Sequence, residues 1–423
     1  MLQEDKHILW RASAVMIGLS LPSMLLGKGL MFGLLVLGIG TGLMATKDES
    51  LRATVRLLLN SRITLAVVAL MAALMPGVAM GPDPLNALDQ WGQVAIFILA
   101  SAALFMTLRE MPGRHLELLM KVLAVATMAA CGLALIDALA HDPRLSGALH
   151  GADKALTPYR LNFMSGALAV ILPFVWARLA LKSREGEPFA VRIAPIASAF
   201  GIVVAITCGG RAGWIGLAVG ILIFLVMASR YHGLVIHKRH WLAGLAIIAL
   251  GIGLYTLAAG WDFVSARISI VGEMQTSPRG MLSGRGDVWA HAWNGFLQHP
   301  LVGVGVMNYR NLPHAVDLHP HNWVLQILVE GGVLGTVALL NLLGLVLWRF
   351  YGYAKGNLYG VAALASVVAF LVTGLANTSI FNGWWLTFFI VTAMLGWRAG
   401  WGGSELKKRR RASVVVKPDN HGR

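Results

Sequence analysis

The densest group of chemically active side chains lies between Pro313 and Asn322. This segment reads Pro-His-Ala-Val-Asp-Leu-His-Pro-His-Asn and stands directly before a long apolar stretch. Histidine is the side chain best suited to accept a proton near neutral pH, so His321 is a candidate general base. Asn322 is well placed to cap a following helix, and a plain helix-entry role for this pair is the alternative.

Metal binding is a second alternative for this segment. Its potential ligands are His314, Asp317, His319 and His321. A His-Pro-His spacing is compatible with zinc, but no fixed second pair completes a ligand set, and we predict a site without a metal. Glu330 follows nine residues after His321. In a regular helix it would lie about 180° around and about 13 Å further along, so we interpret it as a structural hydrogen-bonding group.

Three arginines near the ends of apolar stretches are candidates for binding an anionic ligand. Arg211 follows Cys-Gly-Gly, Arg285 lies between two glycines, and Arg160 follows Pro-Tyr. A guanidinium group offers two parallel hydrogen bonds to a phosphate, and a neighbouring glycine lets the backbone approach closely. We therefore predict phosphate or diphosphate contacts here. The alternative for each is an arginine that only extends to the membrane interface.

The elements that position these residues must be membrane helices. Of the 423 residues, 57% are hydrophobic and only 13% are charged, against about 25% charged in an average soluble protein. A soluble enzyme could not cover that much apolar surface. The apolar runs are continuous rather than alternating, and open sheets cannot face lipid, so we predict an all-α bundle.

About twelve transmembrane helices account for the apolar runs. We expect them at 8–26, 28–45, 62–80, 88–108, 116–140, 159–181, 190–208, 212–229, 240–259, 322–348, 356–376 and 383–400. With both termini in the cytoplasm, 26 of the 35 lysines and arginines fall on the cytoplasmic side and nine on the other. This bias follows the positive-inside rule, and it explains most of the net charge of +15 without nucleic acid as a partner.

The chain is predicted to form one integral membrane domain, 1–423, with one long outer loop and a basic tail. The loop, 260–321, contains an amphipathic helix at about 286–299, which either lies on the membrane surface or lines a groove. The tail, 402–423, is rich in lysine and arginine and is suited to anionic lipid head groups.

The residues after the histidine cluster resemble a known family. His321-Asn322, nine residues, Gly332, two residues and Gly335 match the pattern of O-antigen ligases, of the O-antigen ligase/polymerase superfamily, at the end of the long outer loop as in that family. The resemblance implies a GT-C-like glycosyltransferase in the bacterial inner membrane, with its active site facing the periplasm. It implies His321 as the base and Arg211 and Arg285 as diphosphate ligands; Arg160 is a further candidate.

The implied reaction moves O-antigen polysaccharide from undecaprenyl diphosphate to a sugar hydroxyl of lipid A–core, with inversion. It needs no metal, nucleotide or other cofactor, since the diphosphate bond supplies the energy. The outer acids Asp262, Asp287 and Asp317 are scattered in the sequence, unlike the paired carboxylates of a hydrolytic glycosidase. Alternatives are an O-antigen polymerase or protein O-oligosaccharyltransferase of the same superfamily and, from another class, a lipid or polysaccharide transporter.

Overall fold

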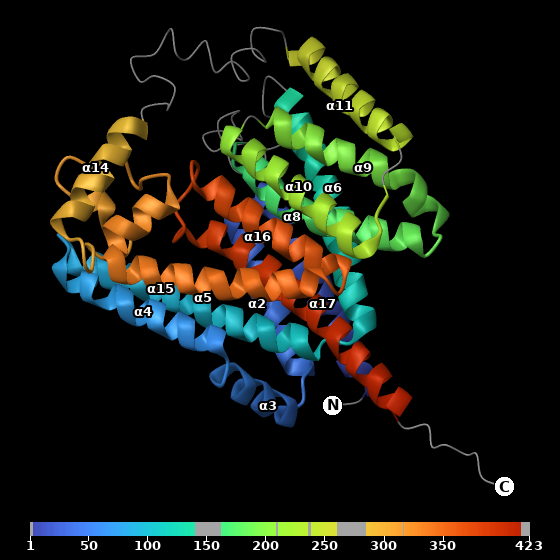
Figure 1. Ribbon diagram of the computed structural model, residues 1–423, viewed down its shortest axis with the longest axis horizontal. Coiled ribbons are helices and arrows are strands. Elements are labelled where there is room, and N and C mark those ends of the chain that lie inside the picture. The colour runs from blue at the N-terminus through green and yellow to red at the C-terminus, as the bar shows by residue number, and fades with distance from the viewer. Residues whose placement is uncertain are drawn as a thin grey trace.

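A computed structural model describes residues 3–139, 162–208, 210–235, 238–259, 285–315 and 317–415. All regular elements within these ranges are helical (Figure 1). The N-terminal half contains α1 (Gln3–Ser20), η1 (Pro22–Leu25), α2 (Lys28–Ala45), α3 (Asp48–Leu59), α4 (Arg62–Met80), α5 (Pro84–Glu110), α6 (Gly113–Leu139), α8 (Asn162–Arg184) and α9 (Pro188–Thr207). The C-terminal half contains α10 (Arg211–His232), α11 (Lys238–Ala259), α14 (Arg285–Gln298), η3 (Tyr309–Asn311), α15 (Trp323–Ala354), α16 (Leu358–Gly374) and α17 (Gly383–Val415).

The chain is a polytopic membrane protein. Each of the twelve apolar ranges expected from the sequence overlaps one α-helix of the described structure. Seven of these helices, α2, α4, α5, α6, α8, α10 and α15, are long and apolar enough to cross a membrane. Shorter apolar stretches occur in α9, α11 and α16. The predicted helices are therefore present, and length and composition support seven of them as full membrane spans.

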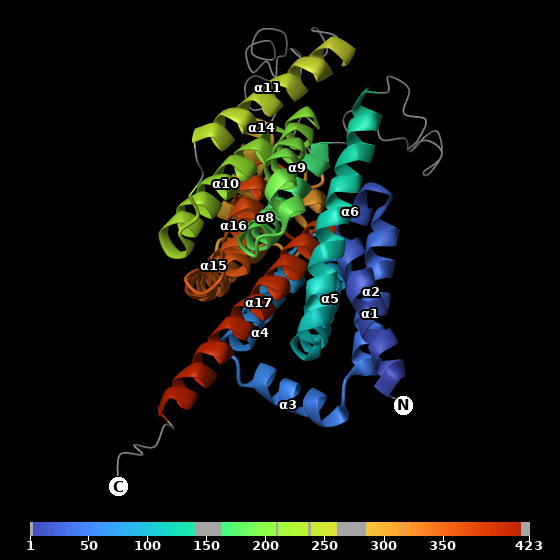
Figure 2. The same cartoon turned by 90° about the vertical axis from the view of Figure 1, so that its right-hand side faces the viewer.

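The structure differs from the expected elements in three places. The first helix ends at Ser20 because Pro22, which has no backbone N–H, begins a short 3-10 helix. The segment between the second and third apolar ranges forms an additional helix, α3, which lies crosswise beneath the ends of the other helices (Figure 2). The last helix continues to Val415, so the predicted tail, 402–423, begins as an extension of α17.

Helix α16 lies at the centre of the bundle and packs against α8, α10, α15 and α17. Its alanines and the glycines of α10 allow the two backbones to approach closely. Gly216 faces Ala369 and Thr373, and a β-carbon at Gly220 would lie 3.3 Å from that of Ala369. In lipid such small residues favour helix association through close van der Waals packing.

Helices α4, α5 and α15 run alongside one another, and α14 covers one end of α15 (Figure 1). The segment that connects α14 to α15, residues 299–322, folds back over the same end. This arrangement brings the histidine cluster, α14 and the first turn of α15 together.

Candidate active site

The connecting segment before α15 has a strained backbone. Among the described residues, only Met307, His314 and His321 are non-glycine residues with a positive φ. This left-handed conformation is uncommon for such residues, and it persists only where the surroundings enforce it, often at functional sites. Asn322 follows directly and caps α15, since its Oδ1 accepts the backbone N–H groups of Val324 and Leu325.

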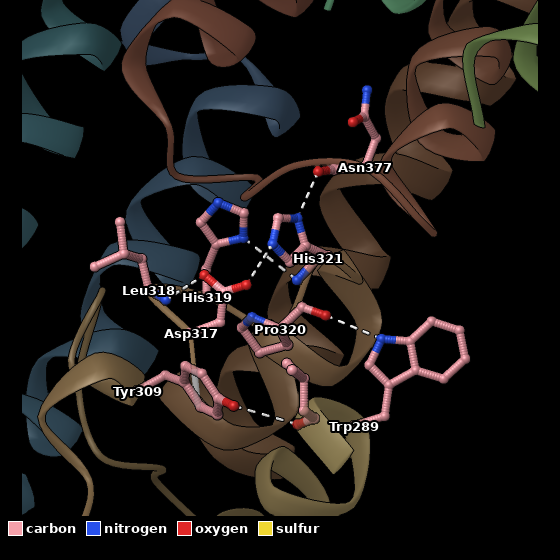
Figure 3. Close-up of polar contacts among 9 residues, drawn as sticks. Trp289, Tyr309, Asp317, Leu318, His319, Pro320, His321 and Asn377 are labelled. Carbon is pink, nitrogen blue, oxygen red and sulfur yellow. Dashed lines mark hydrogen bonds and ion pairs between the residues drawn. The ribbon is translucent and has the colours of Figure 1, made fainter. Parts of the chain in front are cut away.

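Both ring nitrogens of His321 contact oxygen atoms (Figure 3). Nδ1 lies 2.7 Å from the carbonyl oxygen of Asn377, and Nε2 lies 3.0 Å from Oδ2 of Asp317. Because a carbonyl oxygen only accepts, Nδ1 carries a proton. The Asp317 carboxylate also only accepts, so its hydrogen bond to Nε2 forms when Nε2 carries the second, exchangeable proton. The side chain of His321 is 25% exposed, so the ring is oriented by the protein and still accessible.

Asp317 presents an ionised carboxylate to this ring. Its other oxygen, Oδ1, accepts the backbone N–H of Leu318 at 2.6 Å. Partial burial raises the pKa of Asp317, but the Leu318 amide and the nearby His321 outweigh burial, so the pKa lies below its usual value. The carboxylate can therefore stabilise a positive charge on His321.

His319 supports the backbone of His321 rather than its ring chemistry. Its Nδ1 accepts the backbone N–H of His321 at 3.3 Å, and the two ring centroids lie 4.2 Å apart. Burial, followed by the proximity of His321, lowers the pKa of His319 to about 4. At neutral pH the ring is uncharged, as the hydrogen bond at Nδ1 requires. His314 is exposed and lies outside this group of hydrogen bonds.

Helix α14 is attached to the same loop. The indole N–H of Trp289 donates to the carbonyl oxygen of Pro320, the residue before His321, at 3.0 Å (Figure 3). The hydroxyl of Tyr309 donates to the carbonyl oxygen of Val288 at 3.2 Å. Arg285 is the first residue of α14, one helical turn before Trp289. The structure thus brings Arg285 to the His321 end of the bundle.

Arg211 begins α10 at the same end. The carbonyl oxygen of Gly210 accepts a hydrogen bond from Ser165 at 3.1 Å. A β-carbon on the next residue of α8, Gly166, would lie 3.4 Å from Nδ2 of Asn377, whose carbonyl binds His321. The N-terminus of α10 also presents the positive end of the helix dipole, which favours an anion. Arg160 lies outside the described residues.

The two glycines of the motif shape α15. Gly332 has φ 61° and ψ −164°, which interrupts the helix one residue after Gly331. Segment 300–305 fits into the interruption: the N–H groups of Val304 and Gly305 donate to the carbonyls of residues 329 and 330, each at 2.9 Å. A β-carbon at Gly332 would overlap the backbone of Leu301, whereas one at Gly335 would lie 3.1 Å from Leu74 of α4. Gly332 is required by backbone geometry and Gly335 by helix packing.

Glu330 lies in the first part of α15, before the interruption at Gly332, and makes structural hydrogen bonds as expected from the sequence. The side chain is fully buried. Its Oε2 accepts the backbone N–H of Met307 at 2.8 Å and the amide of Gln326 at 3.2 Å. Glu330 therefore ties the left-handed turn at Met307 to the first part of α15.

The pairing of Asp317 with His321 and the contact made by Asn377 were not predicted from the sequence. Asp317 is not isolated, because the turn places it against His321; its spacing of four residues from that histidine was the available signal. Asn377 contributes a backbone carbonyl, which any residue could supply. Its side-chain type therefore could not indicate that it belongs to the site. Within the described ranges, no group of three or more His, Cys, Asp or Glu side chains could hold a metal ion.

The fold and the site define a class of protein: a multi-pass helical membrane protein with an oriented histidine at one end of its helix bundle. Residues 196–340 match the O-antigen ligase family model, so this part of the chain is an O-antigen ligase family domain. The resemblance expected from the motif is thereby confirmed. The matched region contains Arg211, Arg285, His321 and both motif glycines, whereas Arg160 and Asn377 lie outside it.

A distant relative supports the same assignment. A Rickettsia conorii protein, RC0486, whose name proposes a polysaccharide ligase, is 23% identical over 114 residues. The alignment covers 24% of this chain and 28% of that protein. The family model and this relative thus both place the matched part of the chain with polysaccharide ligases.

Proposed function

We propose that this protein is an inverting, GT-C-like O-antigen ligase of the bacterial inner membrane. It transfers polysaccharide from undecaprenyl diphosphate to a sugar hydroxyl of lipid A–core. Both termini lie in the cytoplasm and the His321 end faces the periplasm. Support comes from the family domain and from the charge bias of the loops.

The single observation that carries the proposal is the geometry of the His321 ring. The proton on Nδ1 is fixed by the Asn377 carbonyl, so Nε2 is the nitrogen that can release its proton and then accept one from the acceptor hydroxyl. Asp317 now occupies the position at Nε2 that an acceptor hydroxyl must take. Since the Asp317 side chain is 42% exposed, the hydroxyl can displace it while the carboxylate stays near the ring.

In the reaction, the acceptor oxygen attacks the anomeric carbon and its proton passes to Nε2 of His321. The bond from that carbon to the diphosphate breaks, and the diphosphate leaves with the electron pair. Asp317 stabilises the imidazolium that forms, and Arg211 and Arg285, with Arg160 as a further candidate, offset the charge on the leaving group. This scheme requires no covalent intermediate, metal or nucleotide.

The test is glycan transfer by purified protein, with a defined lipid-linked donor and lipid A–core, in the absence of metal and nucleotide. We expect transfer by the wild type and a loss of about 10²- to 10⁴-fold for His321→Ala. The control is His314→Ala, which changes an exposed histidine of the same segment and should retain most activity.

Assays with other acceptor molecules distinguish the proposed ligase from the alternative activities of the same superfamily. Transfer to a growing O-unit or to a protein, but not to lipid A–core, would replace the proposed ligase by a polymerase or a protein O-oligosaccharyltransferase. Equal losses in His321→Ala and His314→Ala, or inhibition by EDTA that zinc reverses, would overturn the histidine-base mechanism.

A further inference from the structure

A second feature of the molecule is an apolar cavity among α8, α9, α10 and α11. Its volume is about 360 Å³, within the range of roughly 300–1,000 Å³ typical of small-molecule sites. The lining includes Trp176, Ser183, Pro195, Phe224, Leu234 and Gly244. Helix α11, at the outer edge of the molecule, closes it by packing on α9 (Figure 1).

The cavity lies far from the candidate active site. Gly166 of α8 is next to Asn377, and Ser183 of the same helix lines the cavity. These residues are 17 positions apart, which corresponds to about 25 Å along a helix. The cavity therefore opens near the membrane leaflet opposite to His321.

One polar group in the lining lacks a protein partner. Trp176 is 8% exposed, and its indole N–H is buried without a hydrogen-bond acceptor. Its Nε1 is enclosed by protein atoms, so the accessible lining offers a ligand mainly apolar contact.

The rim of the cavity carries basic residues. Arg230 precedes and Lys238 follows the two lining residues Leu234 and Val235. Arg230 and Lys238 are exposed. Arg184, at the end of α8, donates to the carbonyl of His232 and so joins this rim. Lys182 is not included among the basic residues of the rim, because it already forms ion pairs with Glu117 and Glu185.

We propose that this cavity is a binding site for an anionic phospholipid of the leaflet opposite to His321. An acyl chain occupies the apolar cavity, and the phosphate head group contacts the basic rim. The complementary charge at the mouth distinguishes this ligand from a neutral lipid. The polyprenyl tail of the proposed donor is not the occupant, because its diphosphate would be held at the other end of α8.

The test is native mass spectrometry of the full-length protein, delipidated and then mixed with phosphatidylglycerol or phosphatidylcholine. We expect one retained phosphatidylglycerol, bound at least tenfold more tightly than phosphatidylcholine. The double variant Arg230→Gln/Lys238→Gln should lose this preference to within about twofold. Its control, Arg52→Gln/Arg56→Gln, removes two exposed charges from α3 and should keep the preference.

A second pair of variants tests the cavity itself. Gly244 lines the cavity and Gly253 does not, although both lie on α11 and have open space where a β-carbon would be. We expect Gly244→Leu to weaken phosphatidylglycerol binding at least tenfold and Gly253→Leu to leave it unchanged. Equal binding of the two lipids by the wild type, equal losses in both leucine variants, or displacement by equimolar undecaprenyl phosphate would overturn the proposal.

Discussion

The two ends of the bundle use polar residues in different ways. At the His321 end, side chains are held by backbone groups: His321 by the Asn377 carbonyl, Asp317 by the Leu318 amide and Trp289 by the Pro320 carbonyl. At the opposite end, Lys182 pairs with an exposed charge, Glu117, at 2.7 Å, and Arg230 and Lys238 remain exposed. The first arrangement fixes the orientation of each side chain, whereas the second fixes only the local charge.

This difference predicts unequal sensitivity to substitution. Exposed ion pairs contribute little to stability, and their charge can be supplied by many side chains. A group oriented by backbone atoms depends on the path of the chain, so changes that leave charge and hydrophobicity intact should still matter. The following variants test this contrast, beginning with the largest expected effect.

Gly332→Ala should have the largest effect, because it acts on the interruption of α15 that holds segment 300–305. The added β-carbon would meet the Leu301 backbone, at a φ of 61° that alanine rarely adopts. We expect a loss of folded protein and of transfer, measured by size-exclusion yield in detergent and by the transfer assay. Gly344→Ala, on the same helix with open space at the β-carbon, is the control. Normal yield from Gly332→Ala would show that the interruption is not enforced.

Replacement of the arginines by lysine separates geometry from charge. A lysine keeps the charge but loses the two parallel hydrogen bonds of a guanidinium group. We expect Arg211→Lys and Arg285→Lys each to retain protein levels and to lose about 10- to 150-fold in transfer, corresponding to one charge-assisted hydrogen bond. Arg310→Lys is the control, since its hydrogen bond to Asn86 needs a single donor. Wild-type rates in both site variants would exclude bidentate binding.

Asp317→Asn should have a smaller effect than loss of the arginines. The variant removes the negative charge beside His321 but leaves its ring bonded to Asn377. Because Asp317 is 42% exposed, water screens part of its charge, and we expect about a tenfold loss in kcat/KM. Because the pKa of Asp317 lies below its usual value, the carboxylate stays ionised at neutral pH, and the loss should be constant across that range. Asp287→Asn, exposed in the first turn of α14, is the control; equal effects would show that proximity to His321 is irrelevant.

The positions of the helices could be read from the sequence because lipid requires long apolar runs with satisfied backbones. The interruption at Gly332 could not, since apolar residues continue on both sides of it and the partner segment lies 30 residues earlier. The role of Asn377 could not be predicted either, because it acts through its backbone carbonyl, which every residue type has. Asp317 was visible as a residue type, but its pairing with His321 depends on the left-handed turn at His321.

The smallest expected effect concerns His319, whose neutral ring supports the backbone of His321. Its pKa is about 4 in the folded protein and about 6.5 when unfolded, so the unfolded state binds more protons between these values. Folding stability should therefore fall as pH decreases from 6.5 to 4, by at most about 3 kcal/mol, and level off below. His319→Asn retains an acceptor for the His321 N–H but cannot be protonated, so its melting temperature should depend less on pH over this interval. His314→Asn, at an exposed position, should retain the wild-type dependence, and an identical pH dependence in both variants would show that His319 does not oppose protonation in the fold.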